Sequence, residues 1–343
     1  MPMAPAPQPP DPAAVPARPW IRGALPYLVW EALLLLLVVG AAALVATRGV
    51  GLGNAGLQFN IAATGLLATG LALSLRTGTP NLAVSALAGL SGTGYAVLLD
   101  DGWSAMPAAL AAVGVVGLCG LLLGLVTGLT SAPAWAVSLA ALAGAGAIAI
   151  AITDGQSIVV RDLGAPTGGT ASVWLLLFAV VTIGGGLLWQ VRPIRDLLSA
   201  NSSAGQPAGL SARRFVGAMV GFTGSSLLAA LSGLVLVTSL RMAAPSGSDL
   251  FRLALVLAVV LLGGVSALGR RGGIAGTLLA TVLLVLVSTA LTVENTPPWI
   301  TAGLLPAVVI IVGVLVGRLL DFLAGPEPAR TPTAAGQSPT QTQ

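Results

Sequence analysis

The sequence predicts an all-α polytopic membrane protein with about ten transmembrane helices and with both termini in the cytoplasm. Three observations carry this prediction: the apolar composition, the succession of long apolar segments, and the uneven distribution of Arg between the loops. Of the 343 residues, 56% are hydrophobic and only 8% are charged, whereas soluble domains carry about 25% charged residues. So few charges cannot cover the surface of a soluble fold, but a lipid bilayer accepts an apolar surface.

Ten apolar segments follow one another, and each has roughly the 17–25 residues that cross a bilayer as a helix. They are Leu25–Ala46, Leu57–Leu75, Asn81–Leu99, Met106–Leu129, Trp135–Ile152, Val173–Gln190, Phe215–Ser239, Phe251–Leu268, Gly273–Leu291 and Trp299–Leu320. The break at residues 76–80 is the weakest, because segments two and three also fit one interrupted helix followed by a shorter one.

The orientation follows from the basic residues, all of which are Arg. With the N-terminus inside, eleven of the 15 lie in cytoplasmic loops and four lie outside, as the positive-inside rule requires. The inner set is Arg18, Arg22, Arg76, Arg192, Arg195, Arg213, Arg214, Arg270, Arg271, Arg318 and Arg330, and the outer set is Arg48, Arg161, Arg241 and Arg252. This distribution predicts a location in the cytoplasmic membrane with multiple crossings.

The chain divides into one membrane domain and two tails. Residues 1–19 are rich in Pro and Ala and are expected to form a disordered cytoplasmic tail, and residues 324–343 form a polar tail of the same kind. Residues 20–323 form the membrane domain, whose longest cytoplasmic loop spans residues 191–214. Within that loop, Pro207 favours a short helix after Gln206, because proline is tolerated in a first helical turn.

Missing residue types exclude several functions. The chain has no Lys, so it has no Walker A lysine, and it has no His, so it has neither a His-dependent nucleophile nor a His-ligated zinc site. The single Cys119 lies in an apolar run and is read as a small buried hydrophobe. The sequence therefore predicts no enzymatic activity, no catalytic residue, no metal and no cofactor. The scattered Arg residues also argue against nucleic-acid binding.

Small residues recur at helical spacing on two segments. Gly120, Gly124 and Gly128 lie on one helix face, as do Gly217 and Gly221. Small residues let helix backbones approach closely in lipid. These glycines are therefore assigned to helix packing and not to transport.

Ionisable groups are nearly absent from the predicted spans. Glu31 is the only acid clear of a segment end, and it lies near the cytoplasmic end of the first span. Carriers driven by ion gradients usually place carboxylates or His at membrane depth, so this absence argues against ion coupling. The polar candidates for a translocation path are neutral: Asn60, Asn81 and Ser85 could bind a solute or could bond to neighbouring helices. A neutral path needs an external energy source, which points to a partner that hydrolyses ATP.

The cytoplasmic loop carries a recognisable segment. Residues 201–214, Asn-Ser-Ser-Ala-Gly-Gln-Pro-Ala-Gly-Leu-Ser-Ala-Arg-Arg, resemble the coupling segment of permeases of sugar-type ABC importers, in the ribose and simple-sugar branch of the branched-chain amino acid/ribose permease family. The family pattern is N-x-E-A-A-x-x-S-G-I-x-V-x-R, with Ser203 here in the position of Glu. The resemblance implies that the following residues contact an ATPase: Asn201, Ser203, Ala204, Gly205, Gly209, Leu210, Arg213 and Arg214.

Two more stretches are similar to this family, and the resemblance covers roughly residues 50–322. Residues 77–87 look like the G-G-I-D-L-S-V-G segment, with Asn81 in the position of Asp. Residues 262–277 look like G-G-x-S-x-x-G-G-x-G-x-x-x-G-T, which makes Gly263, Gly264 and Ser266 further path candidates.

The resemblance implies a permease subunit of an ATP-driven importer, with the path for a small neutral polar solute such as a monosaccharide. The implied partners are cytoplasmic ABC ATPase subunits, an extracytoplasmic solute-binding protein, and a second permease that is either identical or different. Three alternatives stay open: the same machine moving nucleosides or branched-chain amino acids, an ion-coupled secondary transporter, and a membrane subunit without a path of its own.

Overall fold

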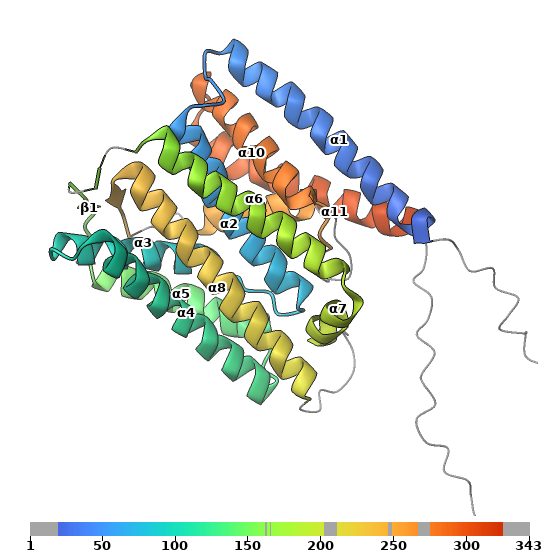
Figure 1. Ribbon diagram of the computed structural model, residues 1–343, viewed down its shortest axis with the longest axis horizontal. Helices are drawn as coiled ribbons and strands as arrows, with labels where there is room; N and C mark the ends of the chain where they lie inside the picture. Colours follow the sequence, from blue (N-terminus) through green and yellow to red (C-terminus); the bar gives the residue numbers. More distant parts are fainter. Residues whose placement is uncertain are drawn as a thin grey trace, which may run out of the picture.

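The computed structural model describes residues 20–161, 163–164, 166–201, 211–245, 249–266 and 275–324. Ten long helices account for most of this part of the chain (Figure 1). They are α1 (Trp20–Thr47), α2 (Ala55–Arg76), α3 (Val84–Asp100), α4 (Ala105–Thr130), α5 (Ala134–Ala151), α6 (Gly168–Gln190), α8 (Ala212–Leu240), α9 (Asp249–Leu262), α10 (Gly276–Val293) and α11 (Leu305–Ala324). Each of the ten predicted segments overlaps one of these helices, so the predicted all-α polytopic membrane fold is confirmed.

Eight of the described helices are long and apolar enough to cross a membrane, while α3 and α9 are shorter apolar helices. Among the eight, α2 and α8 are the most deeply buried, and α1, α5 and α11 expose most of their apolar surface. Leucines such as Leu36 and Leu315 are more than 60% exposed on these outer helices. In lipid such a surface carries no cost, because the surrounding acyl chains are equally apolar.

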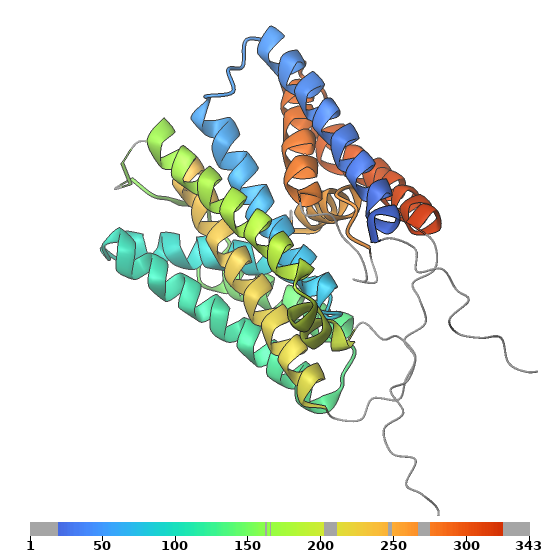
Figure 2. The ribbon, with the colours of Figure 1, turned by 45° about the vertical axis from the view of Figure 1, so that its right-hand side comes forward.

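The helices form two groups around the central pair α2 and α8. Helices α3, α4 and α5 pack against one another, α3 and α4 also pack against α8, and α6 packs against α2. Helices α9, α10, α11 and α1 form the second group, which occupies one side of the molecule in both views (Figures 1 and 2). The start of α1 and the end of α11 lie at the same end of the bundle (Figures 1 and 2).

Helix α9 is shorter than the predicted segment, which continued to residue 268. The helix ends at Leu262 because Gly263 and Gly264 follow it, and Gly264 adopts a left-handed φ of 78°. Only glycine adopts this conformation at little cost. The next helix, α10, begins at Gly276, so α9 and α10 are separate helices. We call the interruption between them the α9–α10 break.

A two-stranded antiparallel ribbon closes one end of the bundle. Strand β1 (Ile158–Val159) pairs with β2 (Met242–Ala243), in the register Ile158 opposite Ala243. The ribbon ties the α5–α6 connection to the end of α8. It lies at the end of the bundle that also holds the α1–α2 connection (Figure 1).

The glycines of α4 form the predicted packing face. Cβ atoms added at Gly120 and Gly124 would lie 2.9 Å from the carbonyl oxygen of Phe222 and 3.0 Å from Cα of Met219, both on α8. Gly128 likewise faces Phe215. The assignment of these glycines to helix packing is therefore confirmed.

Alanine substitutions in α4 test this close packing of α4 against α8. Gly120→Ala is expected to lower the stability of the detergent-solubilised protein by about 1–3 kcal/mol, because the added methyl group forces α4 away from α8. Gly114 is the matched control on the same helix, since a Cβ atom there would meet nothing within 4 Å. Gly114→Ala is expected to leave thermal unfolding unchanged or to raise its midpoint, because alanine favours helix. Equal losses for both variants would contradict the close crossing.

Candidate functional site

A cavity of about 210 Å³ opens between the two groups of helices. One wall comes from α2 and α8, and the other comes from α9 and from the turn that precedes α11. Its polar lining residues are Asn60, Thr64, Ser232, Arg252 and Thr301. The lining is apolar for the most part and carries a few polar groups, as the linings of small-molecule sites do.

The amide of Asn60 is the most available polar group of the cavity. Its Oδ1 accepts a hydrogen bond from Thr64 Oγ1 at 3.3 Å, and among the described residues its Nδ2 has no hydrogen-bond partner. Ser232, in contrast, donates to the carbonyl oxygen of Ala63 at 2.7 Å and so ties α8 to α2. The amide group of Asn60 can therefore donate to a solute oxygen in the cavity.

The opposite wall is shaped by a π-helical turn, η3 (Trp299–Leu304), which continues directly into α11. It follows Pro297 and Pro298, and the carbonyl of Pro297 accepts bonds from the amides of Ile300 and Thr301. The wider turn places Thr301 on the cavity, beside Phe251 and Arg252 of α9. Turns of this kind are frequent at functional sites. Sequence reasoning missed Thr301, for which the two prolines were the available signal.

Asn81 lies elsewhere, fully buried in the connection between α2 and α3. Its Nδ2 donates to Ser225 Oγ of α8 at 2.8 Å, and its Oδ1 accepts from the amide of Ala83 at 3.1 Å. Its own amide donates to Ser74 Oγ at 3.1 Å. Asn81 thus joins the end of α2, the start of α3 and the middle of α8.

Ser85 is also fully buried, one helical turn after Asn81, and within the described residues its hydroxyl has no hydrogen-bond partner. It does not line the cavity. The structure therefore brings Asn81 and Ser85 together at the α2–α3 break but separates both from Asn60.

Gly263, Gly264 and Ser266 form the turn that ends α9. A Cβ atom at Gly263 would lie 2.8 Å from the amide nitrogen of Thr277, because the turn passes directly over the first residues of α10. Gly264 faces Trp30 of α1 and Leu320 of α11. These residues are at the helix break and not in the cavity.

The loop between α6 and α8 begins with a short helix, α7 (Arg192–Leu198), followed by one 3₁₀ turn, η2 (Ser199–Asn201). Pro193 occupies its first turn, where a missing N–H costs nothing. Asn201 Nδ2 donates to the carbonyl of Arg214 at 2.9 Å and so fixes the loop against the start of α8. Ser211 caps α8 by accepting from the amide of Arg214 at 3.3 Å.

The remaining coupling residues lie outside the described part of the chain. These are Ser203, Ala204, Gly205, Gly209 and Leu210, together with the helix expected after Gln206. Of the two arginines that close the loop, Arg213 is exposed and Arg214 is half-buried.

Comparison with known proteins finds several relatives, all of which are named as permease proteins. The autoinducer 2 import system permease protein LsrC of Enterobacter sp. (strain 638) is 28% identical over 267 residues, which cover 75% of this chain and 77% of the relative. The galactofuranose transporter permease protein YtfT of Escherichia coli (strain K12) is 27% identical, over 76% of this chain and 78% of the relative. The ribose import permease protein RbsC of the same strain is 25% identical, over 73% and 81%.

No protein-family model matches the chain, and no solved structure matches it significantly. The relatives named above are transport permeases of import systems. With the many apolar spans of the fold, they identify a multi-pass protein of the bacterial cytoplasmic membrane. Over about three quarters of its length, the chain is thus similar to permease proteins named for the transport of autoinducer 2, galactofuranose and ribose, which supports the resemblance of its motifs to the ribose and simple-sugar permeases.

Proposed function

We propose that the chain is the membrane-spanning subunit of an ATP-driven importer and forms the path for a small neutral polar solute, most simply a monosaccharide. The cavity between α2, α8, α9 and η3 is the observation that carries this proposal. Among the described residues, its polar lining consists of amide and hydroxyl groups and one guanidinium, without a carboxylate. Amides and hydroxyls are suited to the hydroxyl groups of a sugar, and ion-coupled carriers usually supply carboxylates or His instead.

The proposal assigns the two ends of the bundle to the two membrane faces by the distribution of Arg. The cavity, which is lined by the first half of α2 and the last third of α8, then lies toward the outer face, where an extracytoplasmic solute-binding protein would deliver its cargo. The opposite end carries α7 and the loop to α8. There a cytoplasmic ATPase would bind Asn201, Arg213, Arg214 and the residues between them.

The cavity changes the list of path residues. Asn60 stays a candidate and gains Thr64, Arg252 and Thr301 as neighbours. Asn81 and Ser85 are more simply explained as structural residues of the α2–α3 break, and Gly263, Gly264 and Ser266 as residues of the α9–α10 break. A second permease, identical or different, would complete the path.

The coupling loop provides the direct test. Residues 202–210 are replaced by a Gly-Ser linker of the same length, which keeps α7 and the Ser211 cap of α8 intact. Affinity purification from the native membrane in mild detergent, followed by mass spectrometry, is expected to recover an ABC ATPase with the natural chain and at least about tenfold less with the linker variant, because a lost hot spot costs 2 kcal/mol or more.

Matched thermal unfolding of the two proteins shows whether the linker variant is folded. If the ATPase accompanies both chains equally, the loop is not the coupling element. If no ATPase accompanies the natural chain, the ATP-driven proposal is wrong. If the ATPase accompanies the natural chain, the purified complex is reconstituted in vesicles. ATP-dependent uptake is then measured with ribose, galactofuranose and autoinducer 2, the solutes in the relatives' names.

A further inference from the structure

Two adjacent residues of α1 bind the two sides of the α9–α10 break. Trp30 Nε1 donates to the carbonyl oxygen of Leu262, the last residue of α9, at 2.8 Å. Glu31 Oε1 accepts from the amides of Ala275 and Gly276, at the start of α10, at 3.0 and 3.1 Å. The end of one helix and the beginning of the next are thus held by neighbouring side chains of a third.

The same face of α1 also reaches α11. Tyr27 Oη donates to Asp321 Oδ1 at 3.3 Å. Residues 27, 30 and 31 follow the i, i+3, i+4 spacing that places side chains on one helix face. One turn of α1 therefore makes hydrogen bonds to α9, α10 and α11. We call Tyr27, Trp30 and Glu31 the α1 clasp.

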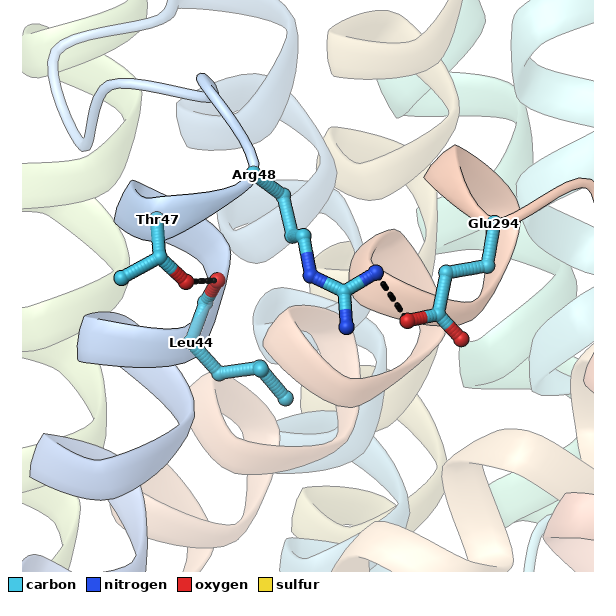
Figure 3. A network of polar contacts seen from close by, with 4 residues as sticks. All are labelled: Leu44, Thr47, Arg48 and Glu294. Carbon is cyan, nitrogen blue, oxygen red and sulfur yellow. Dashed lines mark hydrogen bonds and ion pairs between the residues drawn. The ribbon is translucent and has the colours of Figure 1, made fainter.

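A second contact ties α1 to α10 at the opposite end. Arg48, directly after α1, forms an ion pair with Glu294, directly after α10 (Figure 3). Because Glu31 binds the beginning of α10 and Arg48 binds its end, the two helices run parallel and are joined at both ends. The ion pair is about 40% exposed on both sides, so it contributes less than the partly buried bonds of Glu31.

The bonds of the clasp replace helix bonds that the break removes. A helix leaves amides unsatisfied at its start and carbonyls at its end, and lipid offers no partner for them. The carboxylate of Glu31 also lies where the helix dipole favours negative charge. This position explains an acid within an apolar span: one of its oxygens is engaged by two backbone amides, and Glu31 does not line the cavity.

The helices held by the clasp form one wall of the cavity. Phe251 and Arg252 of α9 and Thr301 before α11 lie on this wall, opposite Asn60 of α2 and Ser232 of α8. The opposing wall is held together by the hydrogen bond that Ser232 of α8 donates to the carbonyl of Ala63 of α2. The cavity therefore lies between two units, each internally hydrogen-bonded.

We infer that Tyr27, Trp30 and Glu31 are positioning residues that make α1, α9, α10 and α11 move as one unit against α2 and α8. This inference rests on the proposed transport function for its mechanistic meaning, because the motion opens and closes the solute cavity. Glu31 acts through the start of α10 and does not carry an ion or touch the solute.

Distances between spin labels test the motion. Labels are placed in the Cys119→Ala background at three exposed positions: Val39 of α1, Val308 of α11 and Leu110 of α4. With ATP and solute added to the assembled complex, the Val308–Leu110 distance is expected to change while the Val39–Val308 distance stays constant. A Val39–Val308 change as large as the Val308–Leu110 change would overturn the inference.

The purified chain alone gives a readout that does not depend on transport. Glu31→Ala is expected to broaden the Val39–Val308 distance distribution, and Glu31→Gln is expected to keep it narrow, because the glutamine oxygen can accept from the same two amides. Leu33→Ala, on the exposed side of α1, is the matched control and is expected to have no effect. Equal distributions in all four proteins would overturn the inference even if the proposed function is correct.

The ratio of solute transported to ATP hydrolysed distinguishes a positioning role of Glu31 from a purely stabilising one. In reconstituted complexes, Glu31→Ala is expected to lower solute transported per ATP hydrolysed by about tenfold, since two partly buried amides lose their acceptor. Glu31→Gln is expected to restore most of the ratio. An unchanged ratio in Glu31→Ala would contradict the clasp. Absence of ATP-dependent uptake in the unaltered complex would instead refute the proposed function, and the label distributions of the chain alone would still decide the inference.

Discussion

Replacing Asn81 with leucine is expected to prevent stable folding and not merely to slow transport. The side chain is fully buried and joins three helical segments through Ser225, Ala83 and Ser74. Leucine is similar in size but leaves the amide of Ala83 without its acceptor and removes the donor to Ser225. We expect a loss of about 2–4 kcal/mol, because each buried unsatisfied group costs roughly 1–3 kcal/mol. The measurement is thermal unfolding of the purified protein in detergent.

Asn81→Asp is the informative companion variant. An aspartate keeps an acceptor for the amide of Ala83 and can accept from the hydroxyl of Ser225, so it is expected to be far less destabilising than leucine. If Asn81→Leu instead unfolds at the same temperature as the natural protein but abolishes uptake, Asn81 belongs to the translocation path and the structural explanation is wrong.

The helices were predictable because the thickness of the hydrocarbon core fixes their length and excludes most charges. Each of the ten predicted segments overlaps a described helix for this reason. The end of α9 was not predictable from hydropathy, since the apolar run Phe251–Leu268 continues across Gly263 and Gly264. A left-handed glycine ends the helix there, and glycine content alone does not mark it in a chain with 45 glycines.

The cavity was predictable only in part. Asn60 stands out in the sequence because an amide within an apolar span needs a partner or a function. Arg252 was interpreted as an outer loop residue that reports topology, and Thr301 was not singled out within the last span. Their proximity to Asn60 depends on how α9 and η3 pack against α2, which is tertiary information.

The partners of polar residues were the hardest feature to predict. Glu31 was recognised as an unusual acid. The two amides that donate to its carboxylate, those of Ala275 and Gly276, lie 244 and 245 positions further along the sequence. Asn81 reaches Ser225 across 144 positions. Hydrophobic periodicity reports which face of a helix is buried and carries no information about which distant backbone group that face meets.

Substituting Asn60 is expected to reduce transport strongly while leaving the fold intact. Its side chain is exposed to the cavity and, among the described residues, bonds only to Thr64, so Asn60→Leu removes little that holds the helices together. It does remove an amide that can donate to a solute hydroxyl and places an apolar group on the path. We expect uptake at limiting solute concentration to fall by about tenfold or more, as loss of a hydrogen-bonding group from a polar site does.

Two further variants make this result specific. Thr64→Val keeps the shape of the wall but removes the hydroxyl that donates to Asn60, so a smaller fall in uptake is expected. Ser172→Ala removes an exposed hydroxyl of α6 that bonds to Gln58 outside the cavity and is expected to leave uptake unchanged. Initial uptake rates into vesicles, with the unfolding temperature measured in parallel, compare the three variants. If Asn60→Leu transports at the natural rate, the solute does not pass this wall, and the cavity between α2, α8, α9 and η3 is not the path.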